Sequence, residues 1–205
     1  LHSGIGGLIR QVKARTDLPV AVITNGALLY LPEVRAELLP ADAILPTLDA
    51  GEADLYRRIN RPHPEVSFER LVDGMTAFSS EYGGKLWVEV MLVQGLNDSE
   101  TALSGIAAAL ERIRPDEVHI NLPSRPPVET WVRPPDDEGL LRAMSILGDV
   151  ARVVHPAEGN FDLSGYGNMV DAVVGIITRH PMREDELLNA LSRWSPADVE
   201  STLRE

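Results

Sequence analysis

Hydrophobic positions along this chain switch repeatedly between a helical and a strand-like spacing. Residues 4–15 place apolar side chains at the i, i+3, i+4 and i+7 positions of one helix face: Ile5, Leu8, Ile9 and Val12. After Pro19, residues 20–23 form an unbroken β-favouring run. A run without alternation predicts a parallel strand that is buried on both faces.

The alternation of elements continues to residue 155. Further helices are predicted at residues 32–39, 53–59, 67–82, 98–114 and 136–147, and further strands at residues 43–48, 85–93, 118–122 and 151–155. Pro46 has no N–H to donate, so it predicts irregular pairing within its strand. Strands and helices that alternate over short connections predict βαβ units, an α/β fold and a parallel sheet. A doubly wound sheet and an incomplete barrel both fit this pattern.

The C-terminal part of the chain has a different pattern. From Asp171 onward, helical segments without any strand are predicted at residues 173–179, 184–191 and 197–204. They fit a helix-turn-helix or the helical part of a winged helix, and they fit a helical cap on the main domain equally well. We therefore expect an α/β domain over residues 1–160 and a helical tail over residues 161–205.

Composition narrows the functional classes. The net charge of −12 over 205 residues disfavours a bulk electrostatic grip on nucleic acid. Residues 182–205 hold six acidic and three basic side chains, which argues against DNA contact by the tail. The absence of cysteine excludes disulfides and thiolate-held metals within these residues and fits a cytoplasmic protein. The apolar runs are too short to span a membrane, and no HExxH, GxSxG or Walker lysine motif occurs.

Polar and glycine residues follow the predicted strands. The four segments are residues 24–26, 47–49, 94–98 and 121–125. Ligands of parallel α/β sheets bind beyond the carboxyl ends of the strands, so we expect these segments to converge on one site. Each segment also has a purely structural explanation, because Asn25-Gly26 is a common turn and Asn97-Asp98 can cap a helix.

Two further features carry possible chemistry. Glu89 interrupts the apolar run of residues 85–93 and shares a face with Trp87 and Met91, so it either points into a barrel lumen or makes a structural hydrogen bond or salt bridge. Prolines hold Arg61 and His63 extended on a loop, where a guanidinium can bind phosphate or carboxylate. Arg57 and Arg58 are explained by a solvated helix face.

Four stretches of the chain resemble the radical S-adenosylmethionine (radical SAM) superfamily, and within it the iron–sulfur oxidoreductases related to tRNA wyosine-base synthases. They are residues 19–30 (PVAVITNGALLY), 46–64 (PTLDAGEADLYRRINRPHP), 85–100 (KLWVEVMLVQGLNDSE) and 121–127 (NLPSRPP). The resemblance implies a partial, TIM-like (β/α)6 barrel that lacks its first strands here. It also implies a [4Fe–4S] cluster held by a CxxxCxxC motif. That cluster would cleave S-adenosylmethionine to a 5′-deoxyadenosyl radical that abstracts hydrogen from a substrate.

The resemblance assigns roles by position. The implied cofactor contacts are Thr24, Asn25, Thr47, Asp49, Gln94, Gly95, Asn97, Leu122 and Pro123. The implied substrate contacts are Arg61, His63 and Arg125, and no catalytic residue is assigned. Because Leu1 begins on a predicted helix, we expect the cysteine motif and the Gly-Gly-Glu motif to precede it in a longer protein. Neither cluster nor S-adenosylmethionine is then expected to bind this chain tightly by itself.

The reaction stays open at this point. The substrate is unassigned, with a tRNA-like molecule or a protein as candidates, and the resemblance implies an electron donor such as flavodoxin or ferredoxin. One alternative is an activating enzyme that installs a glycyl radical on a partner. A second alternative is a non-catalytic binding or regulatory module that uses the helical tail to contact DNA or a partner protein.

Overall fold

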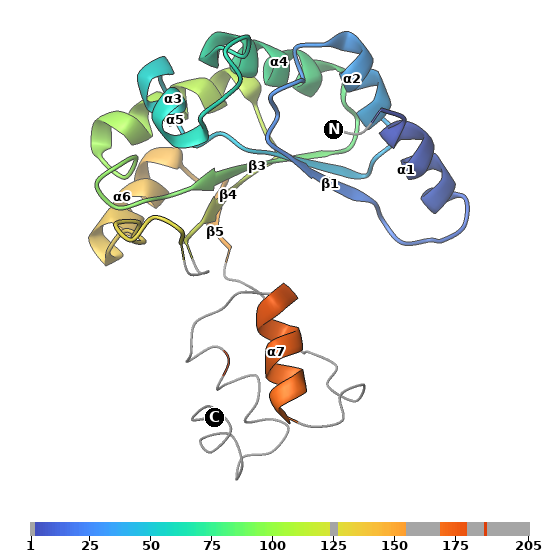
Figure 1. Ribbon diagram of the computed structural model, residues 1–205. Helices are drawn as coiled ribbons and strands as arrows, with labels where there is room; N and C mark the ends of the chain where they lie inside the picture. Colours follow the sequence, from blue (N-terminus) through green and yellow to red (C-terminus); the bar gives the residue numbers. More distant parts are fainter. Residues whose placement is uncertain (1–2, 124–126, 155–168, 180–186, 188–205) are drawn as a thin grey trace. The chain divides into compact units, whose positions relative to one another are not determined.

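The computed structural model describes residues 3–123, 127–154, 169–179 and 187 (Figure 1). The chain divides into two compact units. The first comprises Leu1–Leu122 and Arg133–Val154, and the second comprises Pro123–Val132 and His155–Glu205. The described part of the second unit includes helix α7 (Met169–Arg179), which contains the predicted helix at residues 173–179. The other predicted tail helices, at residues 184–191 and 197–204, lie outside the described residues except for Leu187, which is buried.

A parallel sheet of five strands forms the centre of the first unit. The strands are β1 (Ala21–Thr24), β2 (Ala43–Pro46), β3 (Lys85–Met91), β4 (Glu117–Asn121) and β5 (Ala151–Val153). They lie side by side in the order in which they occur along the chain. The predicted α/β class and parallel sheet are therefore confirmed.

Six described helices cover one face of this sheet (Figure 1). They are α1 (Ile5–Lys13), α2 (Pro32–Leu38), α3 (Ala53–Asn60), α4 (Phe68–Glu81), α5 (Glu100–Ile113) and α6 (Asp137–Leu147). Ser67, Ser99 and Asp136 cap α4, α5 and α6 by accepting a hydrogen bond from a first-turn N–H. A doubly wound sheet has helices on both faces and a reversal of strand order. Neither feature occurs in the described part of this unit.

Pro46 interrupts the pairing of β2 with β3. The ladder runs from Ala43 opposite Lys85 to Ile44 opposite Leu86 and then stops. A single bridge between Thr47 and Glu89 resumes it in the same register. The predicted irregular pairing is confirmed, because a residue without an N–H cannot continue the ladder.

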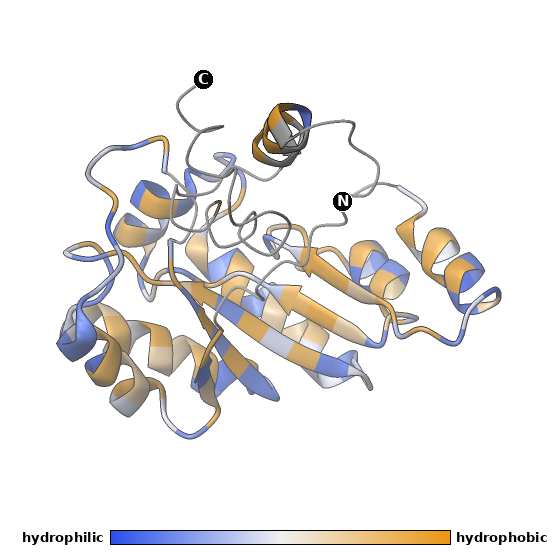
Figure 2. Ribbon diagram, turned by 90° about the horizontal axis from the view of Figure 1, so that it is seen from below, coloured by the Kyte–Doolittle hydropathy of each residue, from blue (hydrophilic) through white to orange (hydrophobic). Residues whose placement is uncertain are grey.

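The two faces of the sheet differ in burial. On β3, Leu86, Val88 and Val90 point toward the helices and are at most 3% exposed. Trp87 and Glu89 lie on the other face and are half-buried. We call this the open face, defined by Trp87, Glu89 and Met91 on β3 and by Glu117, His119 and Asn121 on β4. Figure 2 shows hydrophilic and hydrophobic positions interleaved along the strands.

Strand β1 lies at the edge of the sheet. It pairs with β2 on one side, and the described residues place no strand on its other side. Ile23 is 71% exposed, so the expectation that residues 20–23 are buried on both faces is wrong. The physical reason is that the helices of this unit cover one face of the sheet, so one face of β1 has no described layer against it (Figure 1).

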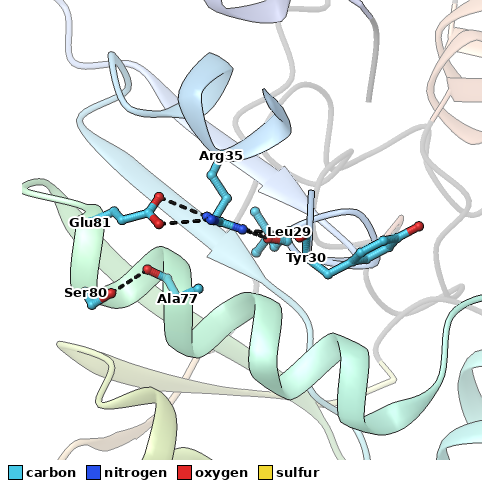
Figure 3. A network of polar contacts seen from close by, with 6 residues as sticks. All are labelled: Leu29, Tyr30, Arg35, Ala77, Ser80 and Glu81. Atoms are coloured by element: carbon cyan, nitrogen blue, oxygen red, sulfur yellow. Dashed lines mark hydrogen bonds and ion pairs between the residues drawn. The ribbon is translucent and has the colours of Figure 1, made fainter. Parts of the chain in front are cut away.

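Arg35 connects two helices of the covering layer (Figure 3). Its guanidinium on α2 donates through Nε and Nη2 to both carboxylate oxygens of Glu81 on α4, at 2.9 and 3.0 Å. Its Nη1 donates to the carbonyl oxygens of Leu29 and Tyr30, at 3.0 and 3.3 Å. Such bidentate pairs are more specific in geometry than a single ion pair. The arginine thus fixes the β1–α2 connection against α4.

Candidate functional site

The first two strands end side by side. The Thr47 N–H donates to the Thr24 carbonyl oxygen at 3.1 Å. The Thr24 hydroxyl oxygen accepts from the Gly26 N–H at 3.2 Å, and the Asn25 side-chain oxygen accepts from the Ala27 N–H at 3.1 Å. The structure therefore brings Thr24 and Thr47 together. It also shows that Asn25, an exposed residue, shapes the turn with its side-chain oxygen.

Asp49 connects the ends of β2 and β3 and the end of α3. The residue is 7% exposed. One carboxylate oxygen accepts from the Met91 N–H and the other from the Asn60 side-chain amide, both at 2.8 Å. Burial raises the pKa of Asp49, the two hydrogen bonds lower it, and the nearby Glu89 carboxylate raises it. Asp49 is therefore a buried acid, and each of its two carboxylate oxygens accepts a hydrogen bond from a neighbouring residue.

Asn97 joins the same network from the loop that follows β3, and its side chain is fully buried. Its amide nitrogen donates to the carbonyl oxygens of Asp49 and Met91 at 2.9 and 2.8 Å. Its side-chain oxygen accepts from the Val93 N–H at 2.8 Å. These contacts use both donors of the amide, so Asn97 holds the strand ends in place.

The loop at residues 94–98 is shaped by its own polar groups. Gly95 has φ +69°, a backbone conformation that glycine adopts without strain. Its N–H donates to the Asp98 side chain at 2.8 Å, and the Asp98 carbonyl oxygen accepts from Arg142 at 2.9 Å. Gln94 is exposed, and its N–H donates to the Arg133 carbonyl oxygen at 2.9 Å. Gln94 and Gly95 are thus the solvent-facing part of this segment.

Glu89 and Asn121, to which the family resemblance assigns no role, form a polar pair on the open face. The Asn121 amide donates to a Glu89 carboxylate oxygen at 3.0 Å. The signal in the sequence was the single carboxylate within the apolar run of β3, and the shared face with Trp87 and Met91 is confirmed. A carboxylate with one amide partner retains the capacity to accept further hydrogen bonds.

The remaining predicted residues lie in several places. Leu122 is half-buried against the core, and Pro123 belongs to the second compact unit. Arg61 ends α3 in a left-handed conformation, φ 46°, immediately after Asn60. The exposed His63 accepts a hydrogen bond from the Glu65 N–H at 3.3 Å through its Nδ1. Arg125 lies outside the described residues.

The residues of this chain do not fit an iron–sulfur cluster. Such clusters need thiolate ligands, and the chain contains no cysteine. The described residues also include no group of three histidine or acidic side chains that would hold a metal ion.

A surface hollow of about 300 Å³ lies at the opposite ends of the strands, before β1 and β2, and its lining includes the Lys13–Asp42 ion pair. No described helix has the length and apolarity that a membrane span requires.

Curated relatives match most of this chain. A UPF0026 protein of Methanocaldococcus jannaschii is 30% identical over 84% of this chain and 56% of its own length. A protein of Brachyspira hyodysenteriae named GTPase Obg is 36% identical over 78% of this chain and 25% of its own length. A GTP 3′,8-cyclase of Lactiplantibacillus plantarum is 28% identical over 49% of this chain. This chain thus spans about half of the first of these proteins and a quarter of the second. No family model matches the chain.

Solved structures share the fold. A domain of a pyruvate-formate lyase-activating enzyme from Bacteroides vulgatus has a TM-score of 0.58 at 15% identity and covers 73% of this chain and 89% of its own. A radical SAM methyltransferase from Sphaerobacter thermophilus has a TM-score of 0.52 at 25% identity and covers 65% of this chain and 39% of its own. Together with the sequence relatives, these structures confirm that the chain resembles the radical SAM superfamily.

Proposed function

We propose that this chain is the C-terminal part of a radical SAM enzyme and forms the later strands of a partial (β/α)6 barrel. The cluster is then held by cysteines outside these residues and supplies the one-electron chemistry on S-adenosylmethionine. A donor such as flavodoxin or ferredoxin delivers the electron. The substrate is a tRNA-like molecule or a protein.

One observation carries this proposal: polar strand ends in a sheet whose strands follow chain order and whose described helices lie on one face. That arrangement is typical of a barrel segment, in which loops after successive strands form one ligand site. The relatives and the radical SAM methyltransferase structure support the same assignment.

The strand ends divide into two groups by exposure. Asp49 and Asn97 are buried and bonded within the protein, so we assign them the role of positioning the loops. The more accessible positions are assigned to cofactor contact: Thr24, Asn25, Thr47, Gln94, Gly95, Leu122 and Pro123. Arg61, His63 and Arg125 are assigned to substrate contact. A rigid buried network beneath an accessible rim is the arrangement that holds a cofactor in one orientation.

The test uses the full-length protein, reconstituted anaerobically with iron and sulfide and then mixed with S-adenosylmethionine and dithionite. We expect 5′-deoxyadenosine, detected by mass spectrometry. Iron uptake without 5′-deoxyadenosine contradicts the proposal, and so does an encoded sequence upstream of Leu1 without a CxxxCxxC motif.

A pair of variants tests the strand-end assignment. Thr24→Val removes the hydroxyl at the carboxyl end of β1. Thr16→Val removes an exposed hydroxyl in the loop before β1, at the opposite ends of the strands. We expect Thr24→Val to weaken S-adenosylmethionine binding about tenfold, the loss of one good hydrogen bond, and Thr16→Val to leave it unchanged. Equal effects of the two variants contradict the assignment of this edge as the cofactor site.

A further inference from the structure

A row of polar side chains crosses the open face below the strand ends. Glu89 on β3 is the register partner of His119 on β4, and His119 is the register partner of Arg152 on β5. Side chains at partner positions of neighbouring parallel strands lie on the same face about 5 Å apart. Two residues earlier on both strands, and so on the same face, Trp87 is the partner of Glu117. This face therefore carries charged and aromatic groups where the helix-covered face carries aliphatic ones.

Two neighbours fix the orientation of His119. Its Nε2 lies 3.2 Å from a Glu117 carboxylate oxygen, and its ring stacks on Trp87 with centroids 5.4 Å apart. An ionised carboxylate at Nε2 favours the tautomer with the proton on that nitrogen. Nδ1 is then a hydrogen-bond acceptor, and no described residue donates to it. His119 is thus held by one nitrogen and accepts with the other.

The charges on this face leave one carboxylate uncompensated. Glu117 is 3.2 Å from the Nε of Arg152, which balances its charge. Lys85 forms its own ion pair with Asp116. Glu89 has a neutral partner, the amide of Asn121, among the described residues. Within the described part of the chain, the charged groups that the contacts and the strand register place beside His119 are thus two carboxylates, Glu89 and Glu117, and one guanidinium, Arg152.

We propose that Glu89 and His119 bind a cationic, planar N–H donor group of the substrate, such as a guanidinium or amidinium, beside the ring of Trp87. Glu89 accepts a charge-assisted hydrogen bond and His119 accepts a second one through Nδ1. Trp87 adds an aromatic surface that attracts cations. This inference deepens the proposed function and rests on it for the identification of the ligand as substrate.

The test measures binding on the full chain without any cluster, so that its failure is separate from a failure of the radical chemistry. Trp131→Phe and Trp194→Phe leave Trp87 as the fluorophore. The probes are butylguanidinium and its neutral analogue butylurea, which have similar shapes. At about pH 8 we expect a saturable change in Trp87 fluorescence with butylguanidinium and a dissociation constant about tenfold weaker for butylurea. Equal affinities for the two probes overturn the proposal.

Two variants identify the binding residues. We expect Glu89→Gln to weaken butylguanidinium binding about tenfold and the control Glu111→Gln, on α5, to leave it unchanged. We expect His119→Phe, which keeps an aromatic ring at this position but removes the Nδ1 acceptor, to weaken butylguanidinium binding by a similar factor. If Glu89→Gln does not fold, the comparison of His119→Phe with the parent decides the question. Affinity that is unchanged in Glu89→Gln or in His119→Phe contradicts the proposal.

Discussion

The two faces of the sheet are built from adjacent residues and serve different ends. On β4, Val118 and Ile120 face the helices and are fully buried, whereas His119 and Asn121 face the open side. The helix-covered face holds the aliphatic core of the unit, including residues on α4 and α5. The open face carries the polar pairs Glu89–Asn121 and Glu117–His119. The difference places the stabilising core on the helix-covered side of these strands and leaves the polar side chains on the other side for the proposed ligand binding.

The largest expected effect tests the difference between the two faces at neighbouring positions of one strand. Ile120→Ala removes a fully buried aliphatic side chain and should lower the free energy of unfolding by about 2–5 kcal/mol. His119→Ala, one residue away on the open face, should cost about 1 kcal/mol or less. Urea denaturation of both variants measures the difference. Similar losses would show that the open face also belongs to the stabilising core.

A smaller loss in the free energy of unfolding is expected for Asn97, a polar residue that is as buried as the aliphatic core. Asn97→Ala removes three hydrogen bonds and leaves an N–H and two carbonyl groups of the strand ends without that partner. We expect a loss of about 2 kcal/mol in the free energy of unfolding, because a buried unpaired polar group costs about 1–3 kcal/mol. The control is Asn25→Ala, whose exposed side chain makes one turn contact, with an expected loss of about 0.5 kcal/mol. The ranking of the two variants in thermal or urea unfolding checks the assignment.

The smallest effect concerns the buried acid. The pKa of Asp49 is raised in the folded state, mainly by burial, so folding is most favourable below the unfolded value of about 3.9. That part of the stability is lost as pH rises through the folded pKa. Asp49→Asn should remove this pH-dependent loss, because an amide does not ionise in this range. The hydrogen bond to Asn60 can be kept, since the Asn60 amide can rotate and present its unpaired Oδ1 to the new N–H donor. At low pH the variant should differ from the parent by less than about 1 kcal/mol.

Chemical denaturation from about pH 3 to pH 7 measures this effect. The control Asp73→Asn changes an exposed carboxylate paired with Arg112. Identical pH dependence in Asp49→Asn and the parent contradicts the assignment of Asp49 as a group with a raised pKa.

Periodicity predicted the order and type of the elements in the first unit because each strand has one apolar, helix-facing side. It predicted β3 two residues too long, since Leu92 and Val93 are buried and apolar but lie beyond the ladder. It also overestimated the burial of β1, because a continuous apolar run does not reveal whether a layer covers each face.

The convergence of the strand-end segments was predictable from the sequence, but their contacts were not. The structure joins Asp49 to Asn97 and Thr24 to Thr47, as expected for loops that follow neighbouring parallel strands. The sequence could not show that Asn97 is buried, because the same Asn-Asp pair before a helix also occurs at exposed helix N-termini, where it caps the helix. Nor could it show that Asn60 and Asn121 are partners of the two carboxylates, since those contacts join residues far apart along the chain.

The edge of β1 on which the described residues place no strand has a practical consequence for handling this chain. A strand edge with free N–H and C=O groups is a template for pairing with other molecules, and the exposed Ile23 adds an adhesive apolar side chain beside it. We therefore expect the chain, expressed by itself, to self-associate as its concentration rises. A lysine at position 23 should suppress that association, since a charge on an edge strand opposes edge-to-edge contact.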